Sequence, residues 1–108
     1  MQKLKYQQYI PAAMWKVFRI KKSEEDLYRK LLKDDRISRL SIAKREAQSL
    51  GIAGEDIYII LEGDENLIEE ARKILEGKEV GAEEANKIYE IYRKQIEDAQ
   101  AGMGAIFG

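Results

Sequence analysis

The side chains that most often perform catalysis are missing from this sequence. Its 108 residues include no His, no Cys and no Thr, which excludes a Ser-His-Asp triad, a thiol nucleophile and a His or Cys zinc site. The sequence also lacks a Gly-x-Ser-x-Gly elbow and a phosphate-binding glycine loop. Only carboxylates, Lys and Tyr remain for acid–base work. We therefore expect no catalytic residue, no metal site and no cofactor, and an enzyme is the least favoured function.

Three carboxylates stand close together after the most apolar run of the chain. Glu62, Asp64 and Glu65 could offer oxygen ligands to Mg²⁺ or Ca²⁺. However, Asp64 is also a good helix N-cap, and Glu65 suits the first turn of a helix. The spacing does not match a calcium-binding loop. Helix-start chemistry explains these residues better than a metal does.

A second candidate site combines basic and aromatic residues near the start of the chain. Aromatic side chains on a sheet, flanked by cations, are one way to bind single-stranded RNA. The alternative is that Trp15, Phe18 and Tyr58 belong to the core, and the aromatic-rich RNP1 motif is absent. We favour the core. The candidate nucleic-acid residues are Lys16, Phe18, Arg19, Lys21 and Lys22.

The chain alternates between strand and helix patterns. Residues 13–20 have apolar side chains at both odd and even positions, which predicts a strand covered on both faces. Ser23 is the expected cap of a helix that stops at residues 34–35. Residues 37–50 fit either a strand or a helix, and we predict a strand over 38–44 followed by a helical turn that ends at Gly51.

The second half of the chain has clearer patterns. Residues 56–62 predict a strand, and a helix capped by Asp64 should end at Gly77. A third helix is expected over 82–101. The predicted class is α+β, with a ferredoxin-like or related β-α-β-β-α core and an additional C-terminal helix. A fourth strand would come from the tail, or the sheet has three strands.

One domain is expected for a chain of this length. We divide it into an N-terminal arm (1–11), an α+β domain (12–101) and an apolar, glycine-rich tail (102–108).

The predicted third helix carries a narrow apolar seam. Its members follow a 4-3-4-3 spacing, over about two heptads: Ala85, Tyr89, Tyr92, Ile96 and Ala99. The seam could pack on the helix's own sheet or pair with the same helix of a second chain. The uncharged tail favours the second alternative, because exposed apolar patches usually mark a contact. We expect the tail to be ordered, docked on its own chain or on a twofold mate. The candidate partner-binding residues are Tyr89, Tyr92, Ile96, Met103, Ile106 and Phe107.

Charge is unevenly distributed along the sequence. Residues 1–45 hold 13 Lys/Arg and 5 Asp/Glu, whereas residues 46–108 hold 6 and 15. Either the two halves pack together through opposite charges, or the basic half offers a face to an anionic partner. We favour the first interpretation.

Residues 43–75 (AKREAQSLGIAGEDIYIILEGDENLIEEARKIL) and the closing GMGAIFG resemble small proteins of hyperthermophilic archaea of the Thermococcales type. The resemblance covers about the last two thirds of the chain. That group has no assigned activity, so the resemblance implies a source and a fold but no function. The high content of charged residues, 36%, fits adaptation to heat.

The first nine residues lack an apolar signal core, and no apolar run is long enough to span a membrane. We therefore expect a cytoplasmic location and no membrane partner. The most favoured function is a small non-enzymatic interaction or regulatory module that forms a homodimer through the C-terminal helix and tail. The alternative is a domain that binds single-stranded RNA with its basic N-terminal half.

Overall fold

The computed structural model describes the backbone of residues 14–107 and the side chains of residues 14–99. Three strands and three α-helices alternate with three short 3-10 turns. In chain order they are β1 (Met14–Ile20), η2 (Lys22–Glu24), α1 (Glu25–Lys33), η3 (Ile37–Arg39), β2 (Ser41–Glu46), η4 (Ala47–Leu50), β3 (Ile57–Gly63), α2 (Glu65–Ile74) and α3 (Ala82–Phe107).

The strands form one antiparallel sheet in the order β1-β3-β2, with Phe18 opposite Ile59 across the central pair. Residues 78–80 extend this sheet at the outer edge of β1. The Arg19 amide donates to the Lys78 carbonyl at 2.9 Å, and the Val80 amide donates to the Val17 carbonyl at 3.1 Å. The predicted α+β class is confirmed, the strand order is compatible with a ferredoxin-like core, and this short bridge lies where a fourth strand would pair.

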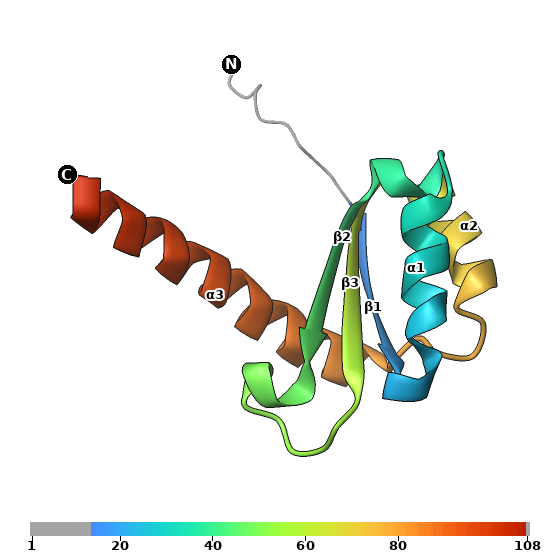
Figure 1. Ribbon diagram of the computed structural model, residues 1–108, viewed down its shortest axis with the longest axis horizontal. Helices are drawn as coiled ribbons and strands as arrows, with labels where there is room; N and C mark the ends of the chain where they lie inside the picture. Colours follow the sequence, from blue (N-terminus) through green and yellow to red (C-terminus); the bar gives the residue numbers. More distant parts are fainter. Residues whose placement is uncertain (1–13, 108) are drawn as a thin grey trace.

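Helices cover both faces of the sheet, α1 and α2 on one side and α3 on the other (Figure 1). Alternate residues of β1 point to opposite faces, so Phe18 and Ile20 enter the α1/α2 layer while Val17 enters the α3 layer. Residues 57–61 of β3 are buried without a break. The prediction of a strand covered on both faces is therefore confirmed for β1.

The expected cap at Ser23 is wrong, because Ser23 lies inside η2. The carboxylate of Glu24 folds back to accept the Lys21 amide at 2.9 Å, and the Glu24 amide donates to the Lys21 carbonyl at 2.8 Å. This reciprocal pair uses the first free amides, and the α-helix begins one turn later. Asp34 ends α1, as expected, and its carboxylate accepts the Ile37 amide at 2.9 Å. That bond holds the pKa of Asp34 below its usual value.

The strand expected over 38–44 is shifted, because β2 begins only at Ser41. Residues 37–39 form η3 instead, which turns the chain so that Ile37 and Leu40 both enter the α1/α2 layer. The turn after β2 ends at Gly51 with a φ of 73°, as predicted. Asp64 caps α2 by accepting the Asn66 amide at 2.7 Å, which confirms the helix-start interpretation of that carboxylate.

Helix α3 is longer than expected, since it continues through residues 102–107 to Phe107. Residues 102–107 therefore add turns to the helix and form no fourth strand. Figure 1 shows that α3 crosses the sheet and that its C-terminal half extends beyond β2. Within the described part of the chain, no helix combines the length and apolarity needed to cross a membrane.

Candidate functional site

The first half of α3 uses its apolar seam to cover the sheet of its own chain. Tyr92 of the seam is 5% exposed, and Ile88, which lies beside the seam, is fully buried. Ala85, Tyr89 and Ile96 pack against the same cluster. For the predicted partner residues Tyr89, Tyr92 and Ile96, the described contacts are with the sheet layer of the same chain.

Tyr89 fixes α3 over the strand ends of β1 and β3. Its ring stacks on Trp15 with centroids 4.0 Å apart and an angle of 4° between the planes. Its hydroxyl donates to Glu62 Oε2 at 2.5 Å. Burial and the neighbouring Glu62 carboxylate together raise the pKa of Tyr89 to about 12. Tyr89 has a structural role here, because its hydroxyl is hydrogen-bonded to Glu62 and stays protonated.

A second polar contact holds the start of α3. Glu84 accepts from the hydroxyl of Tyr58 and from Arg19 Nη1, each at 2.8 Å. Arg19 also lies 3.7 Å from Asp56. Burial and the Glu84 carboxylate raise the pKa of Tyr58. The cation and the hydroxyl both contact Glu84, so this cluster joins the start of α3 to β1 and β3.

A third contact joins α3 to β2 and η4. The Arg45 guanidinium lies 5.1 Å from the ring centre of Tyr92, and its Nε donates to Gln95 Oε1 at 3.3 Å. Gln95 in turn donates to the Ser49 carbonyl at 2.7 Å. Neither Arg45 nor Gln95 stood out in the sequence, since their positions on different elements carry no shared pattern.

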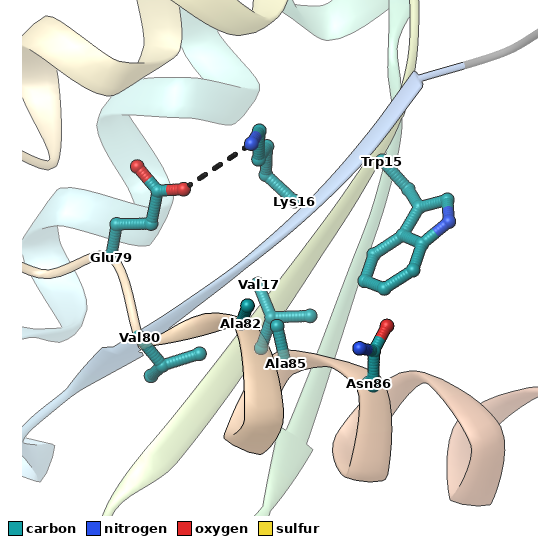
Figure 2. A pocket seen from close by; sticks show the side chains of 8 residues that line it. All are labelled: Trp15, Lys16, Val17, Glu79, Val80, Ala82, Ala85 and Asn86. Carbon is teal, nitrogen blue, oxygen red and sulfur yellow. Dashed lines mark ion pairs between the residues drawn. The ribbon is translucent and has the colours of Figure 1, made fainter.

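A hollow of about 270 Å³ lies where α3 starts beside β1. Figure 2 shows the Trp15 ring and the Asn86 amide on one side, with Val17 and Ala85 between the strand and the helix. Lys16 and Glu79 form an ion pair of 3.6 Å at the opposite side. The hollow is smaller than typical ligand pockets, and its only charged groups pair with each other.

The predicted nucleic-acid residues do not form one surface. Phe18 is 0% exposed in the α1/α2 layer, so its ring is not available for stacking on a base. Lys16 and Arg19 lie at even and odd positions of β1 and therefore point to opposite faces of the sheet, and each forms an ion pair with a carboxylate. Lys21 and Lys22 lie exposed beyond the end of the strand.

The predicted partner residues divide into two groups. Tyr89, Tyr92 and Ile96 pack on the sheet layer. Met103, Ile106 and Phe107 belong to the part of α3 that extends past β2, and their side chains lie outside the described ones. The structure therefore places the two groups on one continuous helix, and the contacts that it describes with the domain are those of the first group.

Among residues 14–99, no group of three or more carboxylates is placed to hold a metal ion. Glu62 accepts from Tyr89 and Asp64 caps α2, so these two carboxylates have structural partners. Searches against protein-family models, curated proteins and solved structures found no match to this chain.

Proposed function

We propose that this protein is a small interaction module that associates with a second copy of itself through the second half of α3. The main support is the length of that helix. It runs to Phe107, whereas its last described contacts with the sheet layer are made by Gln95 and Ile96. In sequence, the 4-3 spacing of the seam continues through Ala99, Met103 and Ile106.

The composition of this segment supports a requirement for packing. Gly102 and Gly104 each weaken a helix by about 1 kcal/mol relative to Ala. A short helical segment without tertiary contacts is marginal in water. The apolar residues of the same segment gain stability only when another surface covers them. A helix with these properties is best explained by a partner.

Pairing through the exposed edge of the sheet is less favoured. On β2, the Lys44 carbonyl accepts from Arg45 Nη1 at 3.0 Å, and the Glu46 carbonyl accepts from Ser49 Oγ at 2.8 Å. Side chains that cover edge carbonyls, together with charged residues, hinder strand addition. The helix is therefore the better candidate for association.

Deleting residues 102–108 tests this proposal. Sedimentation equilibrium of the full chain should show a concentration-dependent dimer, and the shortened chain should stay monomeric over the same range. Because few turns are involved, the dimer should be weak. The matched pair is Ile106→Glu on the seam and Ala101→Glu on the opposite side of the helix. Only Ile106→Glu should abolish the dimer. A full chain that is monomeric at high micromolar concentration contradicts the proposal.

A further inference from the structure

The apolar seam lies along one face of α3. The first half of this face packs on the sheet of the same chain, and the second half continues past it. Positions 85, 89, 92 and 96 of the stripe pack toward the sheet of the same chain. Positions 99, 103 and 106 follow at the same spacing on the same helix. Residues on one such stripe share a face of an α-helix. The domain itself therefore occupies the space on the stripe side next to the first half of the helix.

This arrangement restricts how two copies can pair. In a parallel pair, both domains would lie at the same end and on the facing sides of the two helices, so they would occupy the same volume. In an antiparallel pair, each domain lies beyond the point where the other helix ends. Resting on the proposed function, we infer that two copies associate through an antiparallel pair of α3 helices related by a twofold axis.

The seam spacing also sets the register of this pair. The overlap begins at Ile96, the half-buried last described side chain of α3 that packs on the sheet layer. In the one register that aligns Ile96 and the three later seam positions with one another, Ile96 lies opposite Ile106 of the second copy, and Ala99 lies opposite Met103 of the second copy. The twofold axis then passes near residue 101. The small Ala99 then faces the large Met103, a size match that lets facing helices interlock, and the two isoleucines form an apolar pair.

The charges of α3 agree with this register. It brings the C-terminal end of one helix next to Arg93 of the other copy, which flanks the seam. The Arg93 side chain is exposed and forms no ion pair with another side chain of residues 14–99. The C-terminal end of a helix is the negative end of its dipole and is stabilised by nearby cations.

Disulfide trapping in the full chain tests the arrangement, because the natural sequence has no Cys. The variants are Ala99→Cys and Met103→Cys, with Ala101→Cys as the control on the opposite side of the helix. Each protein is oxidised alone and in equimolar mixtures, and the products are identified by mass spectrometry. The mixture of Ala99→Cys with Met103→Cys should form the mixed disulfide in at least severalfold excess over either same-residue product.

The outcomes separate the inference from the proposed function. Dominant same-residue disulfides at both positions would indicate a parallel pair and overturn the inference, while the self-association would stand. A dimer in sedimentation that gives no disulfide at either position would also overturn it. A chain that is monomeric in sedimentation removes the proposed function itself, before the orientation is considered.

Discussion

Tyr89 is the residue that best explains why α3 lies flat on the sheet. A buried tyrosine needs both an apolar surface for its ring and a partner for its hydroxyl, and Trp15 and Glu62 provide these from two neighbouring strands. The seam spacing of the sequence could not separate this role from a coiled-coil position, because both put an apolar residue at the same helical interval. Only the register of β1 against β3, which places Trp15 opposite Glu62, separates the two.

Replacing Tyr89 with Phe should lower the free energy of unfolding by about 1–2 kcal/mol, because the Glu62 carboxylate loses its donor in a half-buried position. Tyr92→Phe is the matched control. Tyr92 is more deeply buried, yet its hydroxyl has no hydrogen bond to a residue of the described part. Urea denaturation of both variants measures the difference. Equal losses would show that the hydroxyl of Tyr89 contributes nothing.

The difference in the free energy of unfolding between the natural protein and Tyr89→Phe should depend on pH. The pKa of Tyr89 rises from an ordinary value of 10 to about 12 on folding, so its contribution is complete below pH 10 and is lost as the pH rises through 12. The stability difference between the natural protein and Tyr89→Phe should therefore shrink between pH 10 and pH 12. A difference that stays constant over this range would rule out the raised pKa.

At the scale of elements, the sequence predicted well wherever one local signal dominated. The apolar run of β3 and the Asp64 cap of α2 agree with the prediction. The start of α1 was misplaced because the back-bond from Glu24 replaced the expected Ser23 cap. The shift of β2 depends on tertiary packing, which local patterns do not contain. The length of α3 was underestimated because the helix continues through Gly102 and Gly104, which a local pattern takes as helix-ending residues.

The junction between β3 and α2 depends on a residue without a side chain. Gly63 has a φ of +142°, and a Cβ at this position would lie 2.8 Å from Leu40 Cδ2. Leu40 is only 6% exposed, which limits its movement. Gly63→Ala should therefore lower the free energy of unfolding by about 2–3 kcal/mol. Gly77→Ala is the control, since its φ is +77° and no atom lies within 4 Å, and it should lose only about 1–2 kcal/mol. Chemical denaturation that gives equal losses would contradict the role of the Leu40 contact.

At the scale of the whole molecule, ion pairs connect the basic residues of 1–45 with the acidic residues of 46–108. Arg19 pairs with Glu84, Lys16 with Glu79, and Arg36 with Glu70 at 2.6 Å. Each pair joins a cation of the basic half to a carboxylate of the acidic half. These contacts support the interpretation that the halves neutralise each other. The sequence could predict the sign of this interaction but not the partners, because they depend on how the layers pack.

The melting temperature should fall modestly as sodium chloride rises from low concentration to about 1 M, because salt screens exposed charges. Each exposed pair contributes only about 0–1 kcal/mol, so a shift of a few degrees is expected.

Glu70→Gln removes the carboxylate that Arg36 contacts with both its Nε and its Nη2. This variant should melt lower than the natural protein at low salt, and the gap should narrow at high salt. Chloride is preferred to sulfate, which strengthens apolar burial and would hide the effect. A melting temperature that is constant or rises with sodium chloride, together with an unchanged gap for Glu70→Gln, would show that the pairs between the halves do not stabilise the fold.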